Sequence, residues 1–225
     1  TFSPEGGIPV HFSSMVVDNN DSDDFERLFD ATRFKDEDDK TTADVLFGFT
    51  QVINRRMLMQ FNYSYSVVDG YLTDPFKVLS VVDSNGITQD LVYEKRPDTR
   101  TKHSVFVQSK YHFDSVILDA SYRYMADDWE IESHTIDSRF RIPLSNTSYI
   151  EPHLRFYQQT AADFYQPFIS QTEVTPDYAS ADYRIGEMEA FTVGLEYGTK
   201  LTHGNTLSFR LEYYSQKPKD AGFSE

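Results

Sequence analysis

The stretch Leu-Ser-Phe-Arg-Leu-Glu-Tyr at residues 207–213 is apolar or aromatic at every odd position and polar or charged at every even one. Residues 136–142 repeat the alternation, with Ile136, Phe140 and Ile142 on one parity and three charged residues on the other. Because a β-strand points successive side chains to opposite faces, this pattern predicts strands with one apolar and one polar face. Long strands of this kind in series suit an antiparallel transmembrane β-barrel, with lipid outside and water or polar side chains inside.

Eight such segments follow one another, in pairs joined by short turns. The turns contain Asn, Asp, Pro or Gly, which tolerate tight backbone angles. The sequence therefore predicts an all-β meander of about eight long strands, which we expect to be part of a larger barrel. The segments are residues 44–50, 57–66, 104–111, 116–124, 136–142, 150–157, 191–197 and 207–213.

The connections between these pairs alternate in length, as in outer-membrane barrels with short periplasmic turns and longer outer loops. We expect extracellular loops at residues 67–100 and 159–188, and only a short connection near residues 127–129. Residues 77–94 read as a β-hairpin that turns at Ser84-Asn85-Gly86. We place this hairpin outside the membrane, and the alternative is two more membrane strands.

The chain divides into three regions on this basis. Residues 1–42 form an acidic N-terminal loop region with room for one further strand, residues 43–216 supply the barrel strands, and residues 217–225 begin another loop. Eight strands would leave both chain ends on the loop side, whereas barrel termini normally lie in the periplasm. We therefore expect further strands beyond both ends of the sequence, and a complete barrel of about ten to sixteen strands.

Composition excludes several classes of protein. The net charge of -15 argues against a nucleic-acid partner. The mean hydropathy is -0.53, and no run of about twenty apolar residues exists, which excludes a bundle of membrane helices. The absence of cysteine argues against disulfides and thiolate metal sites, and we expect no cofactor and no metal. Acidic runs at residues 18–24 and 36–39 fit solvated loops, with divalent-cation binding as the open alternative.

Tyrosine is common at the loop-side ends of the predicted strands. The tyrosines that face lipid would form an interfacial girdle on that side of the membrane. The tyrosines concerned are Tyr63, Tyr65, Tyr122, Tyr124, Tyr157, Tyr213 and Tyr214.

The segments between the strands resemble a known family. They are residues 70–77 (GYLTDPFK), 93–100 (YEKRPDTR), 121–124 (SYRY) with 127–129 (DDW), 133–135 (SHT), and 155–159 (RFYQQ) with 161–165 (AADFY). Together, over about residues 44–214, they are similar to an uncharacterised family of Gram-negative bacterial outer-membrane β-barrel proteins, a domain of unknown function. The resemblance implies a barrel in the outer membrane and implies no catalytic residues.

Polar and aromatic residues of these segments belong at the loop-side rim of the predicted barrel. Convergent polar groups at the barrel mouth would bind a ligand, an ion or a partner. The structural alternative is that they tie the loops together through Arg–carboxylate hydrogen bonds and Asp turn caps. The rim candidates are Asp74, Glu94, Arg96, Arg100, Asp127, Asp128, Trp129, His134, Asp163 and Tyr165.

The parity opposite the apolar one carries charges of both signs, which we expect to line the lumen. Opposite charges on neighbouring strands can pair across the wall. They would fill a narrow barrel, and in a wide one they would line an aqueous path of weak ion selectivity. We interpret His153 as part of this network, with a transition-metal site as the alternative. The lumen candidates are Asp119, Arg123, Asp137, Arg139, Arg141, Glu151, His153, Arg155, Glu196, Arg210 and Glu212.

We predict a protein without enzymatic activity that acts as a pore, or as a membrane scaffold or anchor for an envelope complex. Its partners would be outer-membrane lipid and, for a scaffold, other envelope proteins. One alternative is a rim hydrolase in which Asp127 or Asp128 orients His134 as a general base, although His134 shares the lipid-facing parity of its strand. A second alternative is a soluble β-barrel that binds a small ligand, which requires the apolar parity to be buried in a core.

Overall fold

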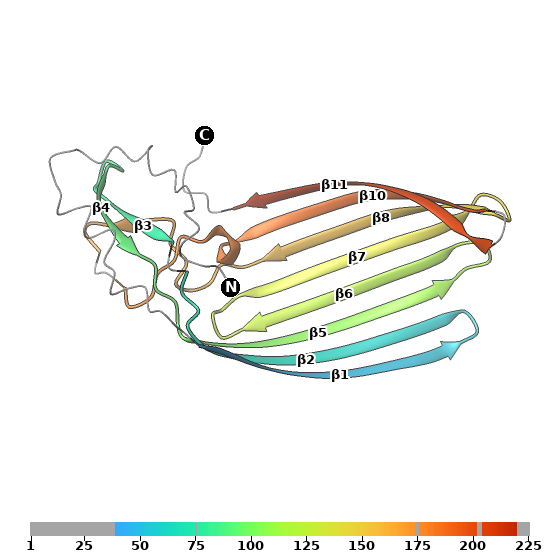
Figure 1. The fold of residues 1–225 in the computed structure, drawn as a ribbon, viewed down its shortest axis with the longest axis horizontal. Helices are drawn as coiled ribbons and strands as arrows, with labels where there is room; N and C mark the ends of the chain where they lie inside the picture. The colour runs from blue at the N-terminus through green and yellow to red at the C-terminus, as the bar shows by residue number, and fades with distance from the viewer. Residues whose placement is uncertain (1–38, 75, 174–175, 202–203, 220–225) are drawn as a thin grey trace, which may run out of the picture. The chain divides into compact units, whose positions relative to one another are not determined.

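The long strands form one antiparallel sheet in the computed structural model, which describes residues 39–74, 76–173, 176–201 and 204–219. The strands are β1 (Lys40–Asn54), β2 (Met57–Gly70), β5 (Thr99–His112), β6 (Ile117–Asp127), β7 (Glu132–Pro143), β8 (Ser148–Gln159), β10 (Met188–Lys200) and β11 (Thr206–Pro218). They lie in the order β1-β2-β5-β6-β7-β8-β10-β11, so each long strand pairs with the next long strand along the chain (Figure 1). The expected antiparallel meander of eight long strands is confirmed.

A smaller sheet lies in the two long connections. The strands β3 (Val78–Val82) and β4 (Thr88–Tyr93) form an antiparallel hairpin, and β9 (Ile169–Ser170) pairs in parallel with β3. Figure 1 shows this sheet at the end of the long strands where β2 stops and β5 starts. The predicted hairpin within residues 77–94 is therefore present. Because it belongs to the smaller sheet, the alternative of two more long strands is wrong.

The hairpin turn is formed by one carboxylate and one glycine. The Asp83 carboxylate accepts hydrogen bonds from the backbone N–H groups of Asn85 (2.8 Å) and Ile87 (2.9 Å). Backbone donation from Ile87, and then from Asn85, lowers the pKa of Asp83 from its ordinary value. Gly86 has a φ of 78°, a conformation that glycine adopts without steric cost.

The long strands extend beyond the alternating segments. Residues 40–42, which were predicted to be loop, begin β1 and pair with residues 68–70, and residues 217–218 end β11. Ladder hydrogen bonds join backbone groups whatever the side chains are, so alternation does not mark where pairing stops. The long connections are accordingly residues 71–98 and 160–187. The rest of the predicted flanking regions, residues 1–38 and 220–225, lies outside the described residues.

The strand register places apolar residues beside apolar residues and polar residues beside polar residues across the sheet. Tyr122 of β6 lies opposite Val107 and Ile136, whereas Ser121 lies opposite Gln108 and Asp137. The result is two continuous faces, which we call the apolar face and the polar face. The apolar face includes Val45, Phe47, Phe49, Met57, Met59, Phe61, Val105, Val107, Leu118, Tyr122, Ile136, Phe140, Leu154, Phe156, Phe191, Val193, Leu195, Leu207, Phe209, Leu211 and Tyr213.

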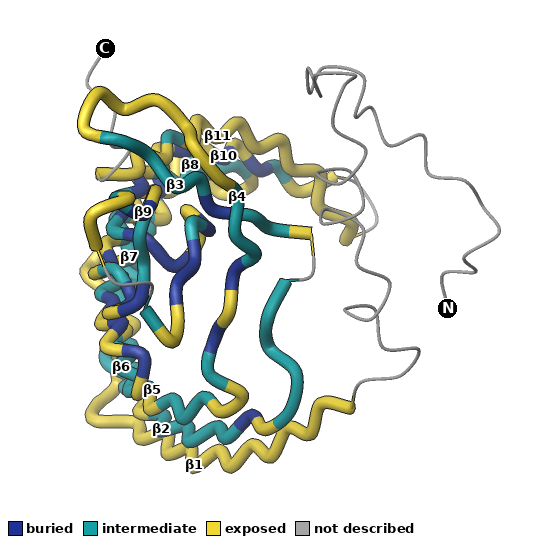
Figure 2. The backbone as a smooth tube through the Cα atoms, turned by 90° about the vertical axis from the view of Figure 1, so that its left-hand side faces the viewer, coloured by how far each residue is buried: buried dark blue, intermediate teal, exposed yellow. Residues whose placement is uncertain are grey.

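Burial in this sheet is the reverse of that in a water-soluble protein. In β10 the apolar side chains of Phe191 and Leu195 are 43% and 50% exposed, whereas Glu196, next to Leu195, is only 8% exposed. Seen end-on, the sheet bends into an arc with β1 and β11 at its two ends (Figure 2). We infer that the polar face lies on the inner side of the arc, since His153 of β8 reaches Glu212 of β11 across the intervening strand.

The exposed apolar face contradicts one alternative. A soluble β-barrel requires the apolar parity to be packed in a core, and in the described residues neither a second layer nor a helix covers it. None of the helices in the described part of the chain is long and apolar enough to cross a bilayer. The edge strands β1 and β11 each pair with one described strand, so the described sheet does not close on itself.

The long strands bury only a few apolar residues, among them Val68, Met188 and Ala190, and the two clusters of buried apolar residues involve the connections. One cluster joins the β6–β7 connection to the second long connection, and the other joins β3 to that same connection. The first consists of Trp129, Ile131, Ala162, Phe164 and Ile185, and the second consists of Leu79, Ile169 and Ala179.

Candidate functional site

All the lumen candidates lie on the polar face. Direct cross-strand neighbours place Asp119 opposite Arg139, Arg139 opposite His153, and Asp137 opposite Arg155. On β10 and β11, Glu196 lies opposite Arg210. The register places the remaining candidates on the same face; they are Arg123, Arg141, Glu151 and Glu212.

His153 connects two carboxylates on this face. Its Nε2 lies 2.8 Å from Asp137 Oδ2, and its Nδ1 lies 2.9 Å from Glu212 Oε1. The imidazole is 7% exposed and bridges two strands that are not neighbours. Gly194 of β10 makes this bridge possible, because a Cβ there would come within 2.8 Å of the Glu212 side chain.

A second charged group lies nearer the short turns. Glu196 accepts hydrogen bonds from the Arg210 guanidinium and, at 2.8 Å, from the Tyr149 hydroxyl. Arg141 Nε donates to Glu151 at 2.7 Å, and its guanidinium lies 4.3 Å from the centre of the Tyr149 ring. Most charges of the polar face are therefore paired within the wall. Tyr149 was not predicted to belong to it.

A recess of about 370 Å³ opens on the polar face where β8, β10 and β11 run side by side. Arg155 lies opposite Thr192, which in turn lies opposite Tyr214. We call this feature the β8–β11 recess. Its lining consists of Arg155, Tyr157, Met188, Ala190, Thr192 and Tyr214.

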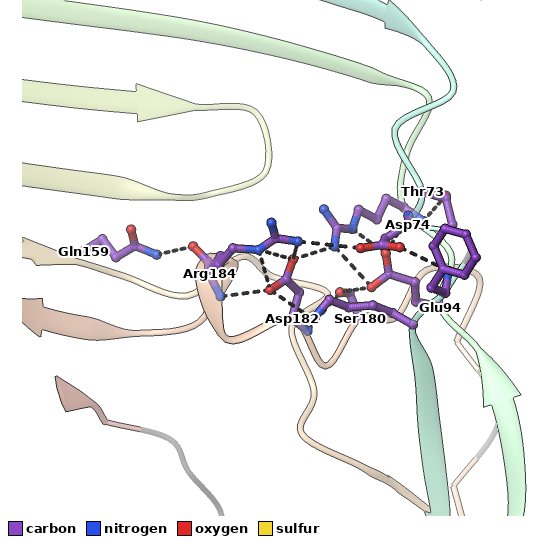
Figure 3. A network of polar contacts seen from close by, with 10 residues as sticks. Thr73, Asp74, Glu94, Gln159, Ser180, Asp182 and Arg184 are labelled. Carbon is purple, nitrogen blue, oxygen red and sulfur yellow. Dashed lines mark hydrogen bonds and ion pairs between the residues drawn. The ribbon is translucent and has the colours of Figure 1, made fainter. Parts of the chain in front are cut away.

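The rim candidates Glu94 and Arg96 belong to a buried ion network that joins the two long connections. Figure 3 shows this network around Glu94, Ser180 and Asp182. Arg96 Nη2 lies 2.8 Å from Asp182 Oδ2 and 3.2 Å from Glu94 Oε2. The Ser180 hydroxyl donates to the same Glu94 oxygen. Glu94, Ser180 and Asp182 are each at most 2% exposed. Sequence reasoning missed Ser180 and Asp182, because nothing local marks a partner 86 residues away.

Asp182 stays ionised in this network despite its burial. Burial alone would raise the pKa of Asp182, but three sets of donors outweigh it and hold the pKa well below its ordinary value. Arg184 donates through its side chain at 2.6–2.9 Å and through its backbone N–H at 3.1 Å. Arg96 also donates to the carboxylate, and Lys77 lies 3.5 Å from it. The same pairing raises the pKa of Arg184.

Three other rim candidates form a compact unit at the β6–β7 connection. The Arg100 guanidinium donates to Asp127 at 2.8 Å and lies 4.3 Å from the centre of the Trp129 ring. Asp127 Oδ1 caps the turn by accepting from the N–H groups of Trp129 and Ile131, both at 3.0 Å. The Trp129 indole N–H donates to the Thr99 carbonyl at 2.9 Å.

The remaining rim candidates are not brought to one place. Asp128 accepts from the Thr101 N–H (2.9 Å), and the Asp163 backbone N–H donates to the Trp129 carbonyl (3.1 Å). Asp74 joins the network around Glu94: its backbone N–H donates to Glu94 at 2.7 Å, and its carboxylate lies 3.7 Å from Arg184 Nη2. The Tyr165 ring packs on Gly186, where a Cβ would come within 2.8 Å of it.

His134 lies on the apolar face with two tyrosines. Its Nδ1 is hydrogen-bonded to the Tyr122 hydroxyl at 2.6 Å, and its ring centre lies 5.1 Å from that of Tyr124. His103 repeats the arrangement with Tyr63 and Tyr65. Among the described residues, neither Asp127 nor Asp128 contacts His134, so the Asp–His pair of the hydrolase alternative is not assembled.

No group of three or more potential metal ligands gathers within the described parts of the chain. The divalent-cation alternative for the acidic runs concerns residues that lie largely outside those parts.

Known proteins give two kinds of similarity. The family model described as "Protein of unknown function (DUF3570)" matches residues 1–225. Among solved structures, the in-vitro folded trimer form of OmpT, an outer membrane protein of Vibrio cholerae, is similar with 12% identity and a TM-score of 0.48, over 80% of this chain and 46% of that one. A second in-vitro folded OmpT structure from Vibrio cholerae has 10% identity and a TM-score of 0.42, over 77% of this chain and 54% of that one. The chain thus spans about half the length of these two structures. No curated protein has significant sequence similarity to it.

Proposed function

We propose that this chain, which belongs to the DUF3570 family of proteins of unknown function, forms part of an outer-membrane β-barrel in a Gram-negative bacterium and lines a water-filled pore. One observation carries the proposal: the apolar face is exposed and the polar face is partly buried. Such an arrangement is unfavourable in water, where large apolar patches associate, and favourable where hydrocarbon replaces water on that face.

The height of the apolar face supports a bilayer. On β2 it runs from Met57 to Tyr65, which is eight steps of about 3.3 Å, or about 26 Å along the strand. A strand tilt of about 40° reduces this to about 20 Å, close to the band of about 25 Å in outer-membrane barrels. The two Tyr–His groups, around His103 and His134, lie near the loop-side end of the band, where aromatic residues favour the membrane interface.

The charges of the polar face support a pore of weak selectivity. Because Glu196 and Glu151 are each paired with an arginine, neither sign dominates the wall. The edges of β1 and β11 would leave backbone groups without partners in lipid. We therefore propose that strands outside the described residues complete the barrel.

A second candidate is a membrane anchor for an envelope complex, without catalytic activity. It is favoured by the folded loop layer, in which the β3–β4–β9 sheet and the Arg96 network hold both long connections in one arrangement. A rigid loop layer offers a fixed surface to a partner protein outside the membrane.

Conductance distinguishes the two candidates. The full-length protein is refolded into lipid vesicles and fused with a planar bilayer. A pore gives stepwise conductance with little preference between potassium and chloride. An anchor gives no conductance, although the folded protein resists extraction from the vesicles by carbonate. Failure to enter vesicles at all would refute both candidates.

A further inference from the structure

We propose that the β8–β11 recess binds a small organic anion with one carboxylate and an aromatic body. The inference rests on the proposed pore for its context, since such a ligand would be a solute that enters the lumen. The recess itself stands on its own geometry: about 370 Å³ of space on the polar face, within the range of small-molecule sites.

Arg155 supplies the positive charge of the recess. Unlike Arg141 and Arg210, its guanidinium has no carboxylate within ion-pair distance among the described residues. The carboxylate opposite it in register, Asp137, is already held by His153 Nε2 at 2.8 Å and lies 3.8 Å from Arg139 Nε. A guanidinium with free donors binds a carboxylate through two parallel hydrogen bonds.

The walls of the recess suit a planar apolar body. Two tyrosine rings line it, and the buried Met188 and Ala190 form its apolar surface. The Tyr157 hydroxyl donates to Gln159 and the Tyr214 hydroxyl donates to Gln216, so both hydroxyls are engaged within the protein. Ring faces and a thioether favour an aromatic ligand.

The few polar groups define the ligand class further. Beside Arg155, the recess offers the Thr192 hydroxyl, while the tyrosine hydroxyl protons are already donated within the protein. A sugar or a peptide needs many more hydrogen-bonding partners than this. An aromatic monocarboxylate needs one cation and an apolar surface.

The test uses 2-naphthoate as the probe and the full-length protein in detergent micelles. Isothermal titration calorimetry measures binding to the wild type, to Arg155→Gln and to Arg123→Gln. Arg123 is the matched control: it lies on the same face, also has no carboxylate partner among the described residues, and is outside the recess. We expect Arg155→Gln to weaken binding at least about tenfold and Arg123→Gln less than about threefold.

Two further probes define the ligand. Naphthalene-2-methanol, which lacks the charge, and sulfate, which lacks the ring, should each bind at least about tenfold more weakly than 2-naphthoate. The proposal is overturned if the wild type does not bind 2-naphthoate, or if the two arginine variants lose affinity equally. Conductance is measured separately: a pore that does not bind 2-naphthoate refutes the recess alone, whereas binding without conductance refutes the pore alone.

Discussion

Arginine introduced at Phe61 tests which face of the sheet meets lipid. Phe61 is 39% exposed and lies between Phe49 of β1 and Val107 of β5, so its direct cross-strand neighbours on the apolar face are both apolar. It is four residues from both Met57 and Tyr65, at the middle of the apolar band of β2. Four residues correspond to about 13 Å along the strand, and to about 10 Å of depth at a tilt of about 40°.

The expected effect follows from that depth. Arginine near the bilayer midplane of a β-barrel costs about 2–4 kcal/mol, which corresponds to a loss of about 30-fold to 1,000-fold in the folding equilibrium. Gln60→Arg is the matched control, since Gln60 is adjacent on the same strand but lies on the polar face opposite Thr50 and Gln108. We expect this control to stay within about 0.5 kcal/mol of the wild type, as for an ordinary surface substitution.

The assay is equilibrium unfolding by urea in phosphatidylcholine vesicles, followed by the shifted mobility of the folded protein on gels without heating. Destabilisation of Phe61→Arg and Gln60→Arg by the same amount would refute the assignment of the apolar face to lipid. Greater destabilisation by Gln60→Arg would show that the two faces are reversed.

The remaining predictions concern the polar face and the loop network. His153→Leu removes the ring that lies within hydrogen-bond distance of both Asp137 and Glu212, and we expect a loss of about 2 kcal/mol in the same urea assay; an unchanged midpoint would mean that the imidazole contributes nothing to the wall. Arg96→Met removes a partner from two buried carboxylates, and we expect about 3 kcal/mol of local destabilisation, seen as faster trypsin cleavage within residues 160–187 while the long strands stay intact. The lowered pKa of Asp182 stabilises the folded loops at pH values above its ordinary value of 3.8, and this contribution is lost as the pH falls through and below that value. Pepsin cleavage of the same segment should therefore accelerate between about pH 4 and pH 2 relative to an Asp182→Asn variant, and parallel profiles would contradict the role of this carboxylate.

Alternation predicted the sheet because, in each strand of a sheet with one apolar and one polar face, apolar and polar residues must alternate. The assignment of Ile136 and Asp137 to opposite faces follows from the side-chain direction of a strand, and the register then continues both faces into neighbouring strands. The ends of β1 and β11 could not be predicted, since Lys40 and Lys217 pair through backbone groups alone.

The loop network shows where sequence reasoning stopped. Glu94 and Arg96 were recognisable as rim residues, but their partners Ser180 and Asp182 lie in the other long connection. The two residues of β9 are too few to show any period. The alternation pattern placed Gly194 on the polar parity but did not indicate its role. Because glycine has no side chain, it leaves room for the Glu212 side chain to reach His153.

The parallel pairing of β3 with β9, together with the ion pair of Arg96 and Asp182, couples two stretches of sequence that are far apart. An insertion in either stretch would break its pairing with the other stretch, so we expect changes in the two stretches to occur together. Aligned relatives should therefore show correlated changes between residues 78–96 and residues 169–184.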